Sequence, residues 1–244
     1  YEYKNKGIDV FLDAVDKLKK EGWKGRKILA FLMIPAGNNG PDKNLAAKLE
    51  GKGSENYKTY ITHNLSNGEC DAILNRIRSF NFDPSKDDVS VAYVPTYLNG
   101  NDGIFNKSYY DILPGMDLTV FPSYYEPCGY TPLESLAFRV PTITTSLAGF
   151  GVWVNDNYKK EHPGISILQR SDSNYHQIVD GAVAKIKEIA NLNAAQEKDY
   201  KANAKDVSSV SLWDNVIVYY KQAYVKALEE VVKRNGAFPE LVEE

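Results

Sequence analysis

Apolar residues recur along the chain in two patterns that alternate. Over residues 10–18 the apolar side chains stand three and four positions apart, the spacing of an amphipathic helix. Residues 27–34 are almost entirely apolar and are followed by Pro35, as at the end of a buried strand. Similar patterns predict further strands at 88–94, at 118–121, from 141 and at 164–168, and further helices at 44–49, 72–78, 108–113, 131–138, 175–190 and 212–232.

This alternation predicts an α/β fold. Strands that alternate with helices form a mainly parallel sheet with helices on both faces, which makes a three-layer domain. The chain has 244 residues, a length that favours one domain over residues 1–244 rather than two. A polar stretch connects the last two predicted helices, and the helix at 212–232 closes the domain.

The most informative stretch is 117–151, in which a strand, a loop, a helix and another strand follow in order. The loop carries Glu126 and Gly129. Thr131 is predicted to be the N-cap of the helix, with Glu134 at the third helical position, which is the pattern of a capping box. Such a unit brings the loop to the carboxyl edge of the parallel strands, where open α/β sheets bind ligands.

The loop is a candidate phosphate site. The amides of Gly129, Tyr130 and Thr131 would lie at the positive end of a helix dipole, and Gly129 has no side chain that keeps a ligand off the backbone. Glu126 and Glu134 could then face one ligand that carries hydroxyls with a diphosphate between them. Ordinary interpretations stand beside this one: Glu134 can serve only as a capping glutamate, Glu126 as an exposed acid and Gly129 as a turn glycine.

The exact order of residues in this stretch is distinctive of one protein family. Residues 124–134 read Tyr-Tyr-Glu-Pro-Cys-Gly-Tyr-Thr-Pro-Leu-Glu, and residues 140–151 read Val-Pro-Thr-Ile-Thr-Thr-Ser-Leu-Ala-Gly-Phe-Gly. They resemble the glycogen synthases of animals and fungi, glycosyltransferase family 3, and the resemblance extends over nearly the whole chain. It implies a retaining glycosyltransferase with two Rossmann-like halves, the GT-B architecture, of which this chain would be the C-terminal, donor-binding half. The implied reaction moves glucose from a nucleotide diphosphate glucose to an α-1,4-glucan, with no metal or other cofactor.

The resemblance also implies roles for single residues. Lys6 would hold the donor phosphates and Glu126 the glucose hydroxyls, which makes these two the candidate catalytic residues. Glu134 would bind the ribose hydroxyls, and Tyr109 would stack on the base. The remaining candidate donor-binding residues are Cys128, Gly129, Tyr130 and Thr131. Taken alone, Lys6 is typical of a solvated surface lysine, and Tyr109, one of 17 tyrosines, is typical of a ring packed at a sheet edge.

Cys128 departs from the pattern, because the animal and fungal synthases carry tryptophan at this position. Glu-Pro-Cys-Gly resembles instead the matching stretch of bacterial and plant starch and glycogen synthases, which use ADP-glucose. The surrounding residues favour UDP-glucose, and ADP-glucose is the alternative. No histidine lies near Cys128 in the sequence, so we expect a small buried thiol and not a nucleophile.

Composition and charge narrow the partners and the compartment. The net charge of −3 gives no reason to expect nucleic acid or an anionic membrane, and no apolar run approaches the roughly 20 residues of a membrane span. The two cysteines, Cys70 and Cys128, are too few for a disulfide framework and fit a reducing compartment such as the cytoplasm. His63 has no Cys or His at ligand spacing, so no metal site is expected there.

Three other functions compete with the transferase. A dinucleotide-dependent oxidoreductase would need Gly-x-Gly-x-x-Gly after the first strand, where Pro-Ala-Gly-Asn-Asn-Gly stands instead. A glycosidase could use Glu126 and Glu134 as its acid pair, but that gives no reason for a glycine-rich helix start beside them. A non-catalytic module that binds nucleotide sugar or glucan stays open on sequence grounds.

The chain begins at Tyr1 without methionine, so we expect it to be part of a longer protein. In the family, the N-terminal half carries the acceptor groove and an active-site histidine, and the donor-phosphate arginine stands just before the position of Tyr1. Residues 37–60 correspond to a long helical insertion that helps to build the family's oligomer, and here this region is much shorter. A homo-oligomer of the full-length protein remains possible.

We predict that the full-length enzyme is not activated by glucose 6-phosphate. The animal and fungal synthases bind this effector through clustered arginines shortly before the closing helix, and this chain has no arginine between Arg170 and Arg234. The lysines of residues 186–213 alternate with acids, as on a solvated helix face. An assay at sub-saturating donor, with and without millimolar effector, checks this; a several-fold rise in rate would contradict it.

Overall fold

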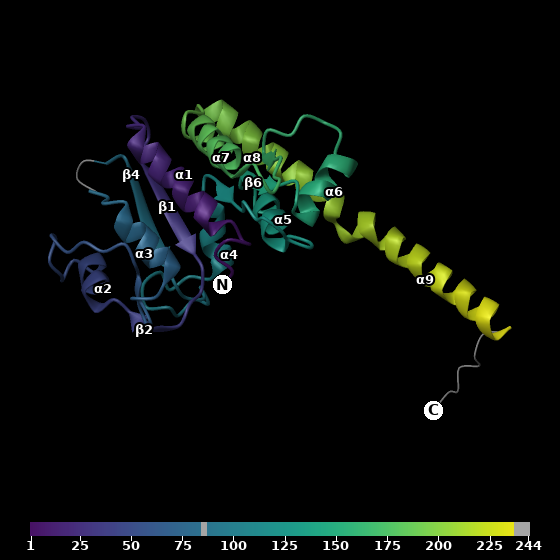
Figure 1. The fold of residues 1–244 in the computed structure, drawn as a ribbon, viewed down its shortest axis with the longest axis horizontal. Coiled ribbons are helices and arrows are strands. Elements are labelled where there is room, and N and C mark those ends of the chain that lie inside the picture. Colours follow the sequence, from purple (N-terminus) through teal and green to yellow (C-terminus); the bar gives the residue numbers. More distant parts are fainter. Residues whose placement is uncertain (84–86, 237–244) are drawn as a thin grey trace.

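The computed structural model describes residues 1–83 and 87–236 (Figure 1). Its helices are α1 (Ile8–Lys20), α2 (Lys43–Leu49), α3 (Ala72–Ser79), α4 (Tyr109–Ile112), α5 (Tyr130–Ala137), α6 (Gly149–Asn157), α7 (Tyr175–Ala190), α8 (Ala194–Ser208) and α9 (Trp213–Asn235), with short 3-10 turns η1 (Leu113–Gly115) and η2 (Ser209–Ser211). Its strands are β1 (Ile28–Met33), β2 (Asn38–Pro41), β3 (His63–Leu65), β4 (Val89–Val94), β5 (Thr119–Val120), β6 (Thr142–Thr145) and β7 (Ile165–Leu168). All the strands predicted from the apolar runs are present.

The predicted α/β class with parallel strands is confirmed. β1 pairs in parallel with β4, and β5, β6 and β7 form a second parallel sheet in that order. Within the described residues no strand pairing joins β1 to β5, so the parallel strands form two leaves rather than one continuous sheet. β2 and β3 pair in antiparallel fashion, which the pattern of residues 37–65 does not predict.

Helices cover both faces of the strands. On one face α1 lies between α3 and α7, and the apolar side chains of these helices share a core with β1, β4 and Ile143 of β6. On the other face α5, α6 and α8 share a second core with Ile165 of β7. Because successive side chains of a strand point to opposite faces, Ile143 enters the first core while Thr142 bonds to Ser135 of α5 on the other. This gives the predicted three layers.

Hydroxyl groups fasten α5 to the strands beneath it. The Ser135 hydroxyl is 2.6 Å from the Thr119 hydroxyl of β5 and 3.1 Å from the Thr142 hydroxyl of β6. Ser135 and Thr142 are almost completely buried, so their hydrogen bonds offset the cost of removing polar groups from water. These bonds therefore hold the second half of α5 against the first residues of β5 and β6.

α6 forms where the sequence shows only the end of the glycine-containing motif. A Cβ on Gly149 would lie 2.2 Å from the Pro127 carbonyl oxygen, and one on Gly151 would lie 2.3 Å from that of Thr145. These glycines therefore let the helix approach two neighbouring backbones, although glycine itself disfavours a helix. The sequence pattern did not predict α6, because the helix depends on close packing with residues distant in sequence.

α8 occupies the connecting stretch that the sequence describes as polar. Asn193 and Gln196 form a capping box at its start, and Ala204 and Val207 are buried against α5 and its neighbours. Apart from alanines, the fifteen residues of α8 hold only Tyr200 and Val207 as apolar side chains, which gives almost no periodic signal, so the helix depends on its cap and on tertiary packing.

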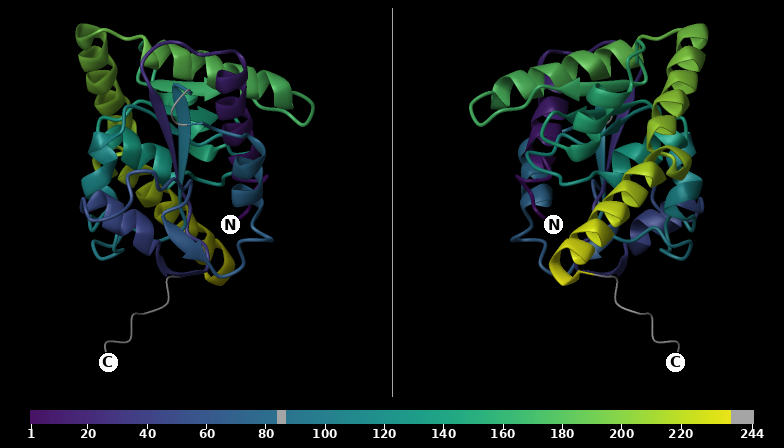
Figure 2. Two further views of the ribbon diagram at one scale, coloured as in Figure 1. Left: turned by 90° about the vertical axis from the view of Figure 1, so that its left-hand side faces the viewer. Right: turned by 90° about the vertical axis from the view of Figure 1, so that its right-hand side faces the viewer.

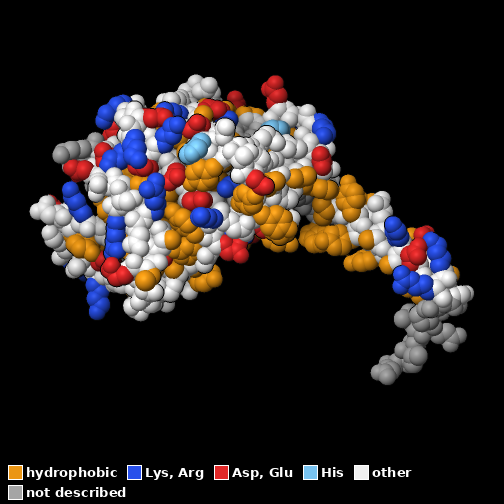
Figure 3. Space-filling view, viewed as in Figure 1, with side chains coloured by type: hydrophobic (Ala, Val, Ile, Leu, Met, Phe, Trp, Pro, Cys, Tyr) orange, Lys and Arg blue, Asp and Glu red, His pale blue; other side chains and the backbone are white. Residues whose placement is uncertain are grey.

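α9 leaves the body of the molecule as a long single helix (Figure 1). In the right-hand view of Figure 2 it points toward the viewer and crosses in front of the body. Large apolar side chains are exposed along it and at its start, as the space-filling view shows (Figure 3). They are Leu212, Trp213, Ile217, Val218, Tyr219, Tyr220, Tyr224, Val225 and Leu228. None of the described helices combines the length and apolarity that crossing a membrane requires.

Candidate functional site

A cavity of about 550 Å³ opens between the two leaves, where β1 and β5 end. Its floor is apolar, with Leu32, Met33 and Phe121 among the lining residues, and Lys6 and Glu126 also line it. A mainly apolar cavity of this volume with a few convergent polar groups is typical of small-molecule sites. Its place at the carboxyl ends of parallel strands is the place predicted for ligand binding.

Lys6 and Glu126 form an ion pair in this cavity, with 2.5 Å between Nζ and Oε2. Their side chains keep 44% and 26% of their surface exposed, so both remain accessible to a ligand. Lys6 lies in the turn before α1. A hydrogen bond from the Lys6 amide to the Glu2 carbonyl closes this turn. Lys6 is thus a paired lysine of the cavity and not the freely solvated one that the residue type alone suggests.

Gly7 explains how residues so far apart in sequence meet. Its φ of 70° lies in the left-handed region, and a Cβ on it would stand 2.0 Å from the Pro122 carbonyl oxygen. The start of α1 can therefore touch the end of β5 only with glycine at this position. A second contact is the hydrogen bond from the Tyr124 amide to the Asn5 carbonyl at 2.7 Å. The residues before and after Lys6, Asn5 and Gly7, are therefore both held against the segment that follows β5.

The loop that carries Glu126 is also held by the segment before α6. The Glu126 amide donates to the Leu147 carbonyl, and its carbonyl accepts from the Gly149 amide at 2.9 Å. One step earlier, the Thr145 hydroxyl donates to the Ser123 carbonyl at 2.8 Å. Because backbone groups are hydrogen-bonded at Ser123, Tyr124 and Glu126, the backbone that carries the Glu126 carboxylate is held in place.

Arg170 is a residue of this region that the sequence interpretation did not identify. It follows β7, is 9% exposed, and donates a hydrogen bond to the Pro122 carbonyl, the same group that Gly7 approaches. Its guanidinium also lies 5.2 Å from the centre of the Tyr124 ring. Burial lowers the pKa of this guanidinium. Nothing in the local sequence indicates a role for a single arginine after a short strand. Only the fold brings Arg170 to the loop that begins at Pro122.

The start of α5 corrects the predicted capping box. Gly129 is the N-cap, with φ of 95°, so Tyr130 is the first helical residue and Thr131 the second. The prediction that Thr131 caps the helix and that Glu134 stands at the third position is wrong. A left-handed glycine turns the chain into the helix two residues earlier than a threonine cap would, which leaves Glu134 free of the capping role. The amides of Tyr130 and Thr131 remain in the first turn, without intrahelical acceptors.

Cys128 is exposed, so the expectation of a buried thiol is wrong. Its backbone carbonyl accepts a hydrogen bond from the Phe150 amide at 2.6 Å, which ties the loop before α5 to α6. Contacts of the backbone, and not burial of the side chain, fix this position.

Tyr110, a residue that the sequence interpretation also passed over, contacts both Tyr109 and Glu134. Tyr109 is half-buried and lines the cavity, whereas Tyr110 is exposed and donates from its hydroxyl to Glu134 Oε1 at 3.0 Å. Tyr110 also stacks on Phe138, with ring centres 5.5 Å apart and planes 15° apart. No sequence signal marks Tyr110, because its partners are on α5 and just beyond it.

The structure therefore brings together only part of the predicted set. Lys6, Tyr109, Glu126 and Thr131 line the cavity. Cys128, Gly129, Tyr130 and Glu134 belong to the adjoining loop and helix but are not among its lining residues. The left-handed backbone of Gly129 explains why glycine stands at this position, and a Cβ there would lie 3.4 Å from Phe150.

Metal-binding clusters are not found among residues 1–83 and 87–236, where no group of three His, Cys, Asp or Glu side chains is suitably placed. His63 is buried, with its ring nitrogens at 2.9 Å from the Thr62 hydroxyl and 2.8 Å from the Asp102 carbonyl. These contacts give the histidine a role in joining β3 to the loop that contains Asp102.

Comparison with known proteins identifies relatives over almost the whole chain. A family model described as glycogen synthase matches residues 45–243. Glycogen (starch) synthase isoform 1 of Saccharomyces cerevisiae is 28% identical, with 98% of this chain and 42% of the yeast protein covered. The glycogen (starch) synthase of Neurospora crassa is 31% identical over 73% of this chain and 25% of its own length. The chain thus spans less than half the length of the curated relatives that it matches.

Solved structures with a similar chain path are more distant. Sucrose-phosphate synthase from Thermosynechococcus elongatus has a TM-score of 0.49 at 16% identity, with 93% of this chain and 43% of that chain covered. The catalytic domain of starch synthase IV from Arabidopsis thaliana, bound to ADP and acarbose, has a TM-score of 0.42 at 16% identity, with 88% and 42% covered.

The burial of Arg170 predicts a clear effect on stability. Replacing it with methionine, Arg170→Met, leaves the Pro122 carbonyl without its charged donor, and we expect a loss of roughly 1.5–3 kcal/mol in the free energy of unfolding. Chemical denaturation measures this. The exposed Arg78→Met, on α3, is the control and should change stability by less than about 0.5 kcal/mol. Equal effects of the two substitutions would remove the special role of Arg170.

Proposed function

We propose that this chain, which belongs to the glycogen synthase family, is the donor-binding half of a retaining glycosyltransferase. It would take part in the transfer of glucose from a nucleotide diphosphate glucose to an α-1,4-glucan. The observation that carries the proposal is the Lys6–Glu126 pair, which lies in a cavity at the carboxyl edge of the strands and beside the start of α5. A cation, a carboxylate and free helix-start amides at one place suit a sugar joined to a diphosphate.

Each group has a task in this proposal. The leaving diphosphate gains negative charge as the glycosidic bond breaks, so cations and amides placed beforehand lower the barrier. Lys6 and the amides of Tyr130 and Thr131 would supply this stabilisation without a metal. Glu126 would accept hydrogen bonds from the glucose hydroxyls and hold the sugar in place. Tyr109, which lines the cavity, would stack on the base.

We propose UDP-glucose as the donor, with ADP-glucose as the alternative. The resemblance of residues 124–151 to the animal and fungal synthases favours UDP-glucose, whereas Cys128 favours the enzymes that use ADP-glucose. Because Cys128 is exposed at the loop, it can contact a ligand or a second domain directly. Parallel titrations with UDP and ADP would rank the two nucleotides.

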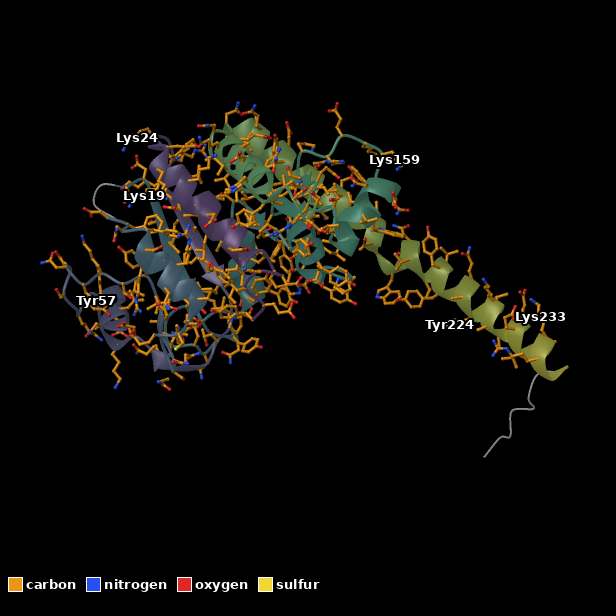
Figure 4. The ribbon with its side chains drawn as sticks, viewed as in Figure 1. Lys19, Lys24, Tyr57, Lys159, Tyr224 and Lys233 are labelled. Atoms are coloured by element: carbon orange, nitrogen blue, oxygen red, sulfur yellow. The ribbon has the colours of Figure 1, made fainter. Side chains whose placement is uncertain are left out.

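The acceptor side would come from an N-terminal half outside this chain. Two observations favour this: the chain covers 42% of the yeast relative, and α9 exposes apolar side chains along most of its length. Exposed apolar patches of this extent usually mark an interaction surface. In the family the closing helix crosses back toward the N-terminal half, and α9 would do the same here. Tyr224 projects from α9 well away from the body of the molecule (Figure 4).

A non-catalytic module that binds nucleotide sugar or glucan is the second candidate function. It would use the same cavity and the same ion pair, so nucleotide binding alone does not separate it from the transferase. Turnover by the full-length protein does, since a module would bind the donor without extending a glucan.

The first experiment is a titration of this chain with UDP. We predict that Lys6→Ala weakens binding by roughly 1.5–3 kcal/mol, because a charge-assisted contact to phosphate is lost. Lys24→Ala is the matched control, since Lys24 follows α1 at the end opposite to Lys6 and is highly exposed (Figure 4). Equal affinity of the Lys6 variant and the parent would exclude Lys6 from the site.

We also predict that the purified 244-residue chain transfers no glucose. In a GT-B enzyme the reaction takes place between two halves, and without the second half water reaches the sugar and weakens the electrostatic stabilisation. The measurement is incorporation of labelled glucose into glycogen by this chain, with the full-length protein as the positive control. Extension of the glucan by the chain alone would refute the prediction.

A further inference from the structure

Tyr110 connects the two elements that would hold the nucleoside. It lies on α4, and its hydroxyl donates to Glu134 Oε1 on α5 at 3.0 Å. Its ring stacks on Phe138 and meets the Tyr109 ring edge-on, with 5.3 Å between the centres of the two tyrosine rings. Two aromatic contacts and one hydrogen bond therefore define its position, although about half of its surface is exposed.

Glu134 has unused hydrogen-bonding capacity. Within the described part of the chain, the hydroxyl of Tyr110 is the one hydrogen-bond donor to the Glu134 carboxylate, and no cation pairs with that carboxylate. A carboxylate has about four acceptor positions, so several remain for a ligand. A free glutamate on a helix surface would sample many rotamers, and ordering it on binding would reduce affinity. The hydrogen bond from Tyr110 orders it beforehand.

The charges of this group are coupled. The hydrogen bond to Glu134 raises the pKa of Tyr110. Like any tyrosine hydroxyl, that of Tyr110 is protonated at neutral pH and can donate. Burial, and then the charge of Glu134, raises the pKa of Tyr109. Tyr110 contacts both residues, through its ring with Tyr109 and through its hydroxyl with Glu134.

We propose that Tyr110 is a positioning residue that orients Glu134 toward the ribose hydroxyls of the donor nucleotide. This inference rests on the proposed function, in which Tyr109 carries the base and Glu134 the ribose. Tyr110 adds no contact to the phosphates or to the sugar that is transferred. It acts through Glu134, so its effect depends on the ribose hydroxyls being present.

The test compares two ligands on one variant. Tyr110→Phe removes only the hydroxyl and keeps the ring that stacks on Phe138. For the 244-residue chain we expect UDP to bind about three- to tenfold more weakly after this substitution. We expect the affinity for 2′,3′-dideoxy-UDP, which lacks the hydroxyls that Glu134 would bind, to be unchanged. In a Glu134→Gln background, Tyr110→Phe should have little further effect on UDP binding.

Tyr200→Phe is the matched control, since Tyr200 donates to Glu188 in another tyrosine–glutamate pair, formed between α8 and α7. It should leave the affinity for both ligands unchanged. Thermal melting of each variant shows that the fold is retained, and the dideoxy ligand reports site integrity independently of the ribose hydroxyls.

Three outcomes would overturn the inference. Unchanged UDP affinity in Tyr110→Phe would show that Glu134 needs no orientation, and tighter binding would show that Tyr110 competes with ribose for the carboxylate. An equal loss for UDP and the dideoxy ligand would indicate a structural role of α4 alone. Failure of the parent chain to bind UDP is a different result, because it removes the proposed function itself.

Discussion

The approach of the segment before α1 to the end of β5 is the contact on which the candidate site depends. Gly7 lies against the Pro122 carbonyl, where no side chain would fit, and the Asn5 carbonyl accepts from the Tyr124 amide. Lys6 stands between these two contacts, so its side chain is delivered to Glu126 by backbone geometry. An ion pair between flexible, partly exposed side chains would by itself be too weak to bring the two loops together.

The Glu126 loop is supported from three directions, which gives the site its fixed geometry. Residues before α1 hold one side, the segment leading into α6 holds another, and Arg170 bonds to the Pro122 carbonyl from behind. Electrostatic stabilisation of a reaction requires groups that are already in place when charge develops. Because Lys6 and Glu126 remain partly exposed, water still screens them, and a second domain over the cavity would strengthen their interaction with a ligand.

The separation of the parallel strands into two leaves creates the space for the ligand. β5 is two residues long, and the amides of Thr119 and Phe121 bond to the carbonyls of Pro141, just before β6, and Ile143 of β6. Within the described residues no strand pairs with β1 on the side of β5. The cavity lies where the two leaves diverge, so the same feature that interrupts the sheet opens a cavity beside the start of α5.

The sequence by itself determined the elements whose signals are local. Apolar runs closed by proline gave β1, apolar residues at helical spacing gave α1 and α7, and their alternation gave the α/β class. The long motif at 124–151 indicated the family and pointed to Glu126, and the resemblance of the start of the chain pointed to Lys6; the structure places both residues in one cavity. The roles of these residues remain predictions.

The tertiary structure decided what depends on partners distant in the chain. It moved the start of α5 to Tyr130, formed α6 through glycines that touch other backbones, and stabilised α8 by burying two small apolar residues. It also exposed Cys128 and brought Arg170 and Tyr110 to their partners. The physical reason is common to all of them: a local pattern records which face of an element is apolar, but a close contact or a hydrogen bond across the fold depends on where two remote backbones meet.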